Sequence, residues 1–135
     1  MKIYFAGSIR GGRDDAVLYN RLISHMKDRG HCVLTEHIGL ESLTSRGEDG
    51  PSDEWIYQRD MSWLNSCDIV IAECSSPSLG VGYELAYAEK AGKKVCVFYR
   101  SSRGRLSAMI SGNSYFDVCV YSTDDELFEQ LDKLL

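Results

Sequence analysis

Short apolar runs alternate with amphipathic segments along the whole chain, and this alternation is the feature that most limits the possible folds. Five runs are typical of strands, at residues 2–7, 32–38, 68–74, 93–100 and 118–121. The segments predicted as helices are 14–30, 53–67, 82–91 and 123–135. Such alternation produces a parallel sheet with helices on both faces. We therefore predict an α/β fold, a doubly wound five-stranded parallel sheet with strand order 2-1-3-4-5.

Length, composition and charge limit the classes of function. The chain has 135 residues, and we expect one domain over residues 1–135. Its formal net charge of -5 argues against a broad nucleic-acid-binding face, which would need clustered basic residues. No apolar run is long enough to span a bilayer. A small anionic ligand held by one or two arginines remains compatible with these numbers.

The five cysteines are odd in number and form no CxxC pair. We interpret them as small buried hydrophobic residues of a protein in a reducing compartment. No signal peptide is expected, because Met1 and Lys2 lead directly into a strand, and we place the protein in the cytoplasm, with the nucleus as an alternative. The cysteines and the three histidines lack the spacing of a metal site, so neither a metal nor a cofactor is expected.

The predicted strand order brings two glycine-rich loops together. In doubly wound sheets, ligands bind outside the carboxyl ends of the strands, where the winding reverses. Here the reversal falls between the first and third strands, which are followed by GSIRGGR (7–13) and SSPSLGVG (75–82). We therefore expect these two loops to face each other across one pocket.

The 7–13 loop has the composition of an anion-binding turn. Gly7, Gly11 and Gly12 allow backbone N–H groups to turn toward an anion. Arg10 and Arg13 carry permanently charged, planar donors that suit phosphate oxygens. An ordinary glycine-containing turn with solvated arginines is the alternative.

The second loop places Ser78 and Gly80 before a predicted helix N-terminus, where free N–H groups favour negative charge. Glu84 is expected in the first turn of that helix, where its ionised form would be stabilised by ~0.3–1 kcal/mol. An ionised carboxylate beside a phosphate pocket is suited to act as a nucleophile. A plain acidic residue at a helix start is the alternative.

Asp60 falls on the inward-facing stripe of helix 53–67, four residues after Ile56 and four before Leu64. Partial burial would raise its pKa and make it a candidate acid. A structural, salt-bridged aspartate is the alternative. Two carboxylates in different environments resemble the pair in retaining glycosidases, and a nearby phosphate pocket suggests cleavage of the N-glycosidic bond of a nucleotide.

Four further candidate residues lie on the predicted strands or near their ends. Tyr4 is on the first strand and could orient Glu84, unless it is only a half-buried strand aromatic. His37 ends the second strand at the ligand-binding edge, as a pocket residue or as a surface histidine. Glu36 and Glu73 are competing candidates for the acidic residues of the site, with the alternative that they only line the pocket edge or face solvent.

Five motifs together resemble the 2'-deoxynucleoside 5'-phosphate N-hydrolases, relatives of the nucleoside 2'-deoxyribosyltransferases. The motifs are YFAGSIRGGR (4–13), TEH (35–37), RDMSWL (59–64), PSLGVGYELA (77–86) and GRLSAMI (104–110). The resemblance covers nearly the whole chain, and the pair GSIRGGR and PSLGVGYEL is its specific part. The 39–53 loop and SSRGRL (101–106) depart most from the family pattern, and the preferred base stays open.

The resemblance implies a flavodoxin-like fold, a homodimer, and hydrolysis of a deoxynucleoside monophosphate to free base and 2-deoxyribose 5-phosphate without a cofactor. It implies that Glu84 forms a covalent deoxyribosyl intermediate, that Asp60 assists base departure and water attack, and that Tyr4 positions the nucleophile. Ser107 would reach the phosphate of the neighbouring subunit. The other residues expected to bind the substrate are Gly7, Ile9, Arg10, Gly11, His37, Ser78 and Gly80.

Three alternatives to this hydrolase remain. A nucleoside 2'-deoxyribosyltransferase would share the covalent intermediate and pass the sugar to a second base. A ribonucleoside monophosphate phosphoribohydrolase would cleave the ribose substrate, although relatives of that kind look to have phenylalanine where this chain has Tyr4. A nucleotide-binding module would bind the monophosphate without releasing a base.

Overall fold

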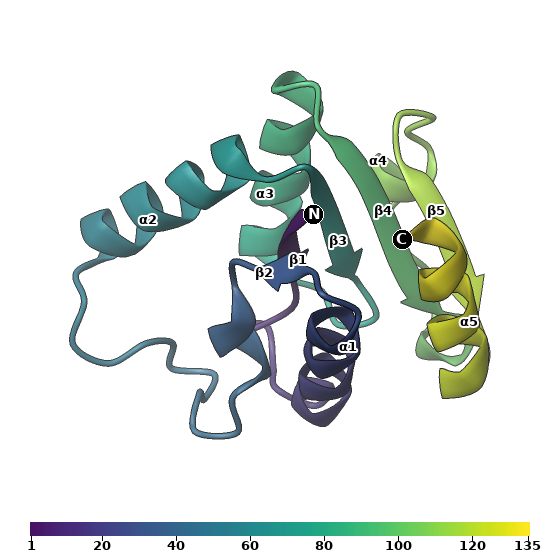
Figure 1. The fold of residues 1–135 in the computed structure, drawn as a ribbon, viewed down its shortest axis with the longest axis horizontal. Helices are drawn as coiled ribbons and strands as arrows, with labels where there is room; N and C mark the ends of the chain where they lie inside the picture. Colours follow the sequence, from purple (N-terminus) through teal and green to yellow (C-terminus); the bar gives the residue numbers. More distant parts are fainter.

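The computed structural model describes residues 1–135, and it contains one five-stranded sheet (Figure 1). All neighbouring strands are parallel, and their order is β2-β1-β3-β4-β5, which confirms the predicted topology. The strands are β1 (Lys2–Ala6), β2 (Cys32–Val33), β3 (Ile69–Glu73), β4 (Lys94–Arg100) and β5 (Asp117–Tyr121).

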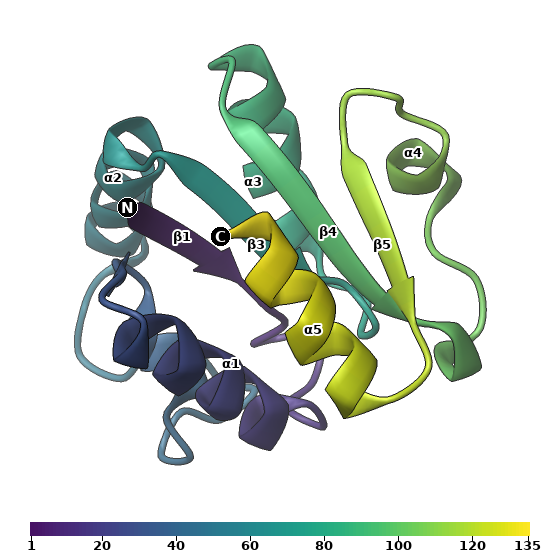
Figure 2. The ribbon, with the colours of Figure 1, turned by 45° about the vertical axis from the view of Figure 1, so that its right-hand side comes forward.

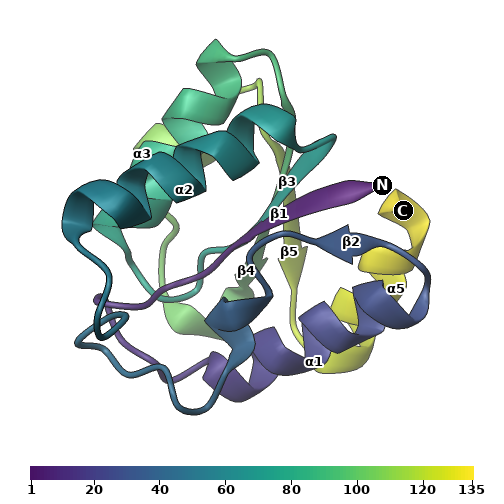
Figure 3. The ribbon, with the colours of Figure 1, turned by 60° about the vertical axis from the view of Figure 1, so that its left-hand side comes forward.

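Helices cover both faces of the sheet (Figures 2 and 3). On one side lie α1 (Ala16–Asp28) and α5 (Asp124–Leu134), and on the other lie α2 (Asp53–Ser66), α3 (Leu79–Lys90) and the short α4 (Ala108–Ser111). Two 3₁₀ helices complete the structure, η1 (Glu36–Gly39) and η2 (Ser101–Arg103). None of these helices has the length and apolar character needed to cross a membrane.

The core is divided by the sheet into two layers. Leu22 and Met26 of α1 and Leu127 of α5 are buried in one layer, and Leu64 of α2 and Leu85 of α3 in the other. Every residue of β3 is buried, as expected for a central parallel strand covered on both faces. The predicted helices 14–30 and 123–135 therefore both pack against this face of the sheet.

The second strand is shorter than the predicted 32–38. The chain leaves the ladder after Val33, and the hydroxyl of Thr35 accepts a hydrogen bond from the Phe5 N–H (2.9 Å) and donates one to the Phe5 carbonyl (2.6 Å). Because this side chain replaces the backbone partners of Phe5, the strand ends early and residues 36–39 form η1.

All five cysteines are free, but their burial is uneven. Cys67, Cys74 and Cys96 are buried, and Cys119 is partly buried, as expected. Cys32 is exposed, contrary to the interpretation of all five as core residues, because it lies on the edge strand β2.

Candidate active site

The two glycine-rich loops touch each other at the carboxyl ends of β1 and β3, so their predicted proximity is confirmed. A Cβ atom at Gly11 would lie 2.0 Å from the carbonyl oxygen of Pro77, so only glycine allows this approach. Gly12 has a φ of 133°, a backbone conformation that residues other than glycine rarely adopt. The Ser8 N–H donates to the Tyr19 hydroxyl (3.1 Å), which ties the first loop to α1.

The helix that carries Glu84 begins earlier than predicted. Its N-cap is Ser78, whose hydroxyl accepts a hydrogen bond from the Val81 N–H (3.3 Å), and its first residue is Leu79. Gly80 therefore lies inside the helix, and Glu84 is its sixth residue. The prediction that Glu84 lies in the first turn is wrong, and with it the expected stabilisation by the helix start, which fades within one turn.

Glu84 is held by one oxygen. The Tyr4 hydroxyl donates a 2.9 Å hydrogen bond to Glu84 Oε1 across 80 positions of sequence. Burial raises the pKa of Tyr4 well above its usual value, so the phenol keeps its proton and acts as the donor. Burial also raises the pKa of Glu84 to about 7, although the hydrogen bond from Tyr4 opposes this shift.

Asp60 completes what we call the carboxylate cluster, which consists of Tyr4, Asp60 and Glu84. The Asp60 side chain is 24% exposed, so the inward position predicted from the helical period is confirmed. Burial raises its pKa, against the opposing effect of Arg59. The charge of Asp60 in turn raises the pKa values of both Glu84 and Tyr4, which means that the three groups interact.

The expected division between an ionised Glu84 and a partly protonated Asp60 does not hold in the free protein. Both carboxyl groups have raised pKa values, and burial is the largest cause in each case. The charge of Asp60 is a further cause of the raised pKa of Glu84.

The two arginines of the first loop have different surroundings. Arg13 donates hydrogen bonds to the carbonyl oxygens of Ser8, Ile38, Leu40 and Leu43, so its guanidinium is used to hold the chain after η1. This structural use of Arg13 differs from the predicted role as a phosphate donor. The Arg10 side chain is 73% exposed, and Asp53 lies 4.0 Å away. Arg10 is therefore available to an anion.

A polar network around Asp60 contains two residues outside the predicted site, Arg59 and Glu48. The ion pair from Arg59 to Asp60 (2.8 Å) fits the alternative of a salt-bridged aspartate. Arg59 donates to both carboxylate oxygens of Glu48, at 2.6 Å each, and to Asp60 Oδ1 through Nε (2.9 Å). His37 joins this network, with Nε2 3.3 Å from an Arg59 nitrogen, and burial lowers its pKa. The adjacent Arg59 and Asp60 in RDMSWL were a visible signal, but nothing in the 39–52 loop singled out Glu48.

The two competing acids have separate structural partners. Glu36 is exposed and pairs with Lys27. Glu73 is 0% exposed, and its carboxylate accepts hydrogen bonds from the Ser75 N–H and hydroxyl and from the Tyr121 hydroxyl (2.9 Å). Glu73 therefore braces the start of the turn that leads to Ser78.

The remaining predicted site residues are Gly7, Ile9 and Ser107. Gly7 packs on the ring of Tyr19, where a Cβ would be 2.8 Å from a ring carbon, and Ile9 packs against the core layer of α1 and α5. Ser107 is exposed at the N-cap of α4, and its hydroxyl accepts a hydrogen bond from the Met109 N–H (3.3 Å). Within one chain, no hydrogen bond joins Ser107 to the other predicted site residues.

Several known proteins are similar to this chain in sequence or in fold. A 5-hydroxymethyl-dUMP N-hydrolase from Danio rerio is 44% identical over 98% of this chain and 99% of its own. A 5-hydroxymethyl-dUMP N-hydrolase from Tetraodon nigroviridis is 53% identical over 83% of this chain and 80% of its own. Among solved structures, a CMP N-glycosidase from Clostridium botulinum has a TM-score of 0.69 at 18% identity, over 98% of this chain and 99% of its own, and shares the fold.

The family model described as nucleoside 2-deoxyribosyltransferase matches residues 3–128, a range that contains both glycine-rich loops and all three members of the carboxylate cluster. The chain belongs to the nucleoside 2-deoxyribosyltransferase family.

Proposed function

We propose that this protein hydrolyses the N-glycosidic bond of 2'-deoxynucleoside 5'-monophosphates and releases free base and 2-deoxyribose 5-phosphate. The observation that supports this proposal most is the 2.9 Å hydrogen bond from Tyr4 to Glu84 Oε1, within a cluster where the charge of Asp60 acts on Glu84. The similarity to N-hydrolases of a deoxynucleoside monophosphate supports the same substrate class.

In the first step, Glu84 Oε2, the oxygen not bound to Tyr4, attacks C1' of the deoxyribose. The bond between C1' and the base nitrogen breaks, its electron pair leaves with the base, and Asp60 donates a proton to the base. The raised pKa of Asp60 suits it to carry that proton. The product is a deoxyribosyl ester of Glu84, and Tyr4 keeps the carboxylate in the attacking orientation.

In the second step, water resolves the ester. Asp60, now ionised, takes a proton from the water, and the water oxygen bonds to C1' while the bond from C1' to Glu84 breaks. This restores the Glu84 carboxylate and completes a retaining, two-step hydrolysis.

The 5'-phosphate is assigned to the junction of the two glycine-rich loops. The N-terminus of α3, capped by Ser78, offers free N–H groups and a favourable dipole. Gly11 allows the first loop to approach within contact of Pro77 at this junction, and the exposed Arg10 can add a charged donor. The phosphate then binds at the N-terminus of α3, and the nucleophile Glu84 lies in the second turn of the same helix.

We further propose that the active form is a homodimer in which Ser107 completes the phosphate site of the neighbouring subunit. Leu79 at the start of α3 is 97% exposed, Met109 in α4 is 82% exposed, and Tyr83, one turn after Leu79, is half-exposed. Exposed apolar side chains of this size near a polar site are typical of a subunit interface. The compartment remains our prediction, the cytoplasm or the nucleus, and the five free thiols agree with a reducing one.

A panel of substrates tests the proposed reaction. The purified protein is incubated with deoxy and ribo monophosphates, including modified pyrimidines, and free base is measured by liquid chromatography. The proposal predicts base release from at least one deoxy monophosphate and slower release from its ribo counterpart. Faster cleavage of the ribo substrate would support a phosphoribohydrolase, a new nucleoside formed with an added second base would support a transferase, and binding without release over hours would support a nucleotide-binding module.

A further inference from the structure

Arg59 is held in an unusually well defined position. Its side chain is 14% exposed and lies between two indoles of the same helix, with its guanidinium carbon 5.1 Å from the Trp55 ring centre and 4.6 Å from that of Trp63. These tryptophans are four residues before and four after Arg59, on the same face of α2. Cation–π contacts of this kind stabilise a guanidinium and limit its rotation.

This position turns Arg59 toward its sequence neighbour. Adjacent residues on a helix do not normally face each other. Here Arg59 Nε is 2.9 Å and a terminal nitrogen 2.8 Å from the same atom, Asp60 Oδ1. No hydrogen bond within the chain involves Asp60 Oδ2. The carboxylate is thus fixed by one oxygen while the other stays available, as with Glu84 and Tyr4.

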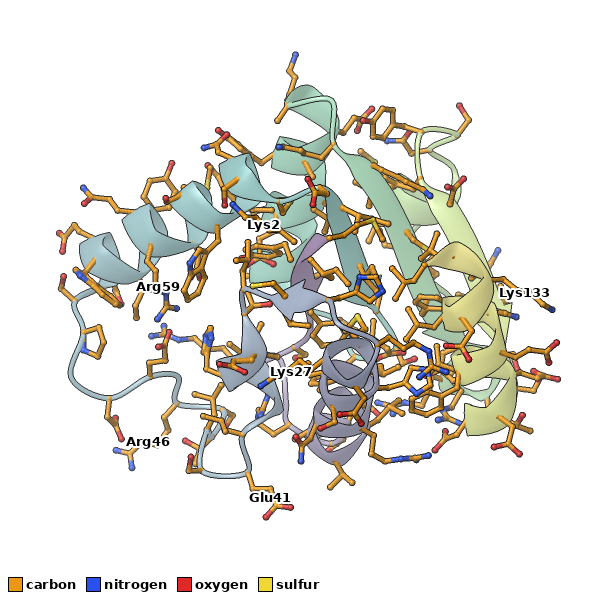
Figure 4. The ribbon with its side chains drawn as sticks, in the orientation of Figure 1. Lys2, Lys27, Glu41, Arg46, Arg59 and Lys133 are labelled. Atoms are coloured by element: carbon orange, nitrogen blue, oxygen red, sulfur yellow. The ribbon has the colours of Figure 1, made fainter.

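The terminal nitrogens of the guanidinium bind the segment between η1 and α2. Glu48 accepts two hydrogen bonds from Arg59 at 2.6 Å, in the paired geometry that suits arginine and carboxylate. Its side chain is 19% exposed, so water screens the pair only partly. Figure 4 shows the Arg59 side chain leaving α2 toward this segment.

We propose that Arg59 is a positioning residue that acts through Asp60: it fixes Asp60 by Oδ1, leaves Oδ2 free for the leaving base and the attacking water, and is itself held by Glu48. This inference rests on the hydrolysis proposed above. It also assigns a task to the 39–53 loop, because Glu48 belongs to that loop.

The second step of the reaction is where Arg59 matters most. Asp60 must be ionised to take the proton from water, and Glu84 is then an ester that no longer titrates. Arg59 opposes the effect of burial and lowers the pKa of Asp60. The charged and titratable groups that act on or around Asp60 come from every neighbouring element, namely Arg59 on α2, Glu48 in the loop, His37 on η1, Tyr4 on β1 and Glu84 on α3.

The inference predicts that two variants shift the pKa of Asp60 in opposite directions. Arg59→Met keeps an unbranched side chain between the tryptophans but removes the charge, and the Asp60 pKa should rise by about one unit or more. Glu48→Gln removes the negative charge that competes for Arg59, and the Asp60 pKa should fall. The pKa is read from the ¹³C carboxyl signal of Asp60, assigned with Asp60→Asn. General damage to the site would instead move both variants in the same direction.

Turnover provides a second readout. In Arg59→Met, kcat should fall about tenfold to hundredfold, and its low-pH limb should move to higher pH. The effect of Arg59→Met should largely vanish in an Asp60→Asn background, because Arg59 acts through Asp60. Arg59→Lys keeps the charge without the planar fork, so it should restore most of the Asp60 pKa and less of kcat.

Arg21→Met is the matched control. Arg21 also pairs with a carboxylate, Asp124 at 2.5 Å, and also covers an aromatic ring, that of Phe128 at 5.1 Å, but it lies on α1 at the other face of the sheet. This variant should change neither the Asp60 pKa nor kcat. An unchanged Asp60 pKa in Arg59→Met, or an equal fold loss with and without Asp60, would overturn the inference. If the unmodified protein releases no base, the proposed hydrolysis is contradicted. The titration would still decide whether Arg59 lowers the pKa of Asp60.

Discussion

Tyr4 and Glu84 are joined by a 2.9 Å hydrogen bond that connects the interior strand β1 to the second turn of α3. The bond leaves one oxygen of Glu84 free and partly offsets the rise that burial causes in its pKa. Tyr4 is almost fully buried, so its position is set by the core. The sheet therefore fixes the orientation of the proposed nucleophile, and helix α3 alone does not.

Tyr4→Phe should weaken catalysis in a pH-dependent way. Without the hydrogen bond the pKa of Glu84 rises above about 7, so a smaller fraction is ionised at neutral pH. We expect kcat/KM at pH 7 to fall about tenfold and its low-pH limb to move to higher pH. Tyr87→Phe, which removes a 3.0 Å hydrogen bond from α3 to Asn65 of α2, is the control and should retain the original profile.

Glu84→Gln should be more stable than the unmodified protein at high pH. The folded-state pKa of Glu84 is raised from 4.5 to about 7, so between these values the folded protein binds the proton more tightly than the unfolded chain. Stability from this group is therefore complete at low pH and is lost as the pH rises through about 7. Urea unfolding at pH 8.5 should show a gain of roughly 1–3 kcal/mol for the variant, which shrinks at pH 5. An equal gain at both pH values would contradict the raised pKa.

Gly11→Ala should separate the two glycine-rich loops. The new methyl group would lie 2.0 Å from the Pro77 carbonyl oxygen, a backbone atom that cannot move without shifting the turn before Ser78. We expect KM for the monophosphate to rise about tenfold or more, because the phosphate junction opens. Gly82→Ala is the matched control: nothing lies within 4 Å of its Cβ position, and alanine within α3 should stabilise the helix by about 0.5–1 kcal/mol. Steady-state kinetics that show the same KM in both variants would argue against the junction.

Mixed dimers test whether Ser107 acts on the neighbouring subunit. Ser107→Asp keeps an N-capping side chain on α4 but should repel the substrate phosphate. Mixing this variant with Glu84→Gln produces heterodimers in which one site carries both changes and the other carries neither. Activity should then return to roughly a quarter of the original. If Ser107 serves its own chain, mixing inactive variants will restore no activity.

Much of the fold followed from the periodicity of the sequence, while local backbone details did not. The inward position of Asp60 came from the 3.6-residue repeat and is confirmed by its 24% exposure. The start of α3 was misjudged because Gly80 and Gly82 suggested a loop, whereas the Ser78 cap and tertiary packing keep both residues helical. The early end of β2 depends on Thr35, whose hydroxyl occupies the hydrogen-bonding groups of Phe5.

The electrostatics of the site depended on contacts that no local pattern encodes. Arg59 and Glu48 are 11 positions apart, and Glu48 lies in a loop without periodicity, so their pairing emerges only from the folded chain. An ionised Glu84 was predicted from a place in the first turn of a helix, but Glu84 lies in the second turn and burial raises its pKa. A side chain's depth is a tertiary property, and residue spacing predicts it only in part.

Intact-mass spectrometry of acid-quenched reactions tests the proposed chemistry most directly. The protein is mixed with a deoxynucleoside monophosphate that it cleaves, quenched within the first turnovers and digested to locate any modified peptide. We predict a 2-deoxyribose 5-phosphate adduct on Glu84, and neither adduct nor base release in Glu84→Gln. Base release by Glu84→Gln at the rate of the unmodified protein would contradict the assignment of Glu84 as the nucleophile.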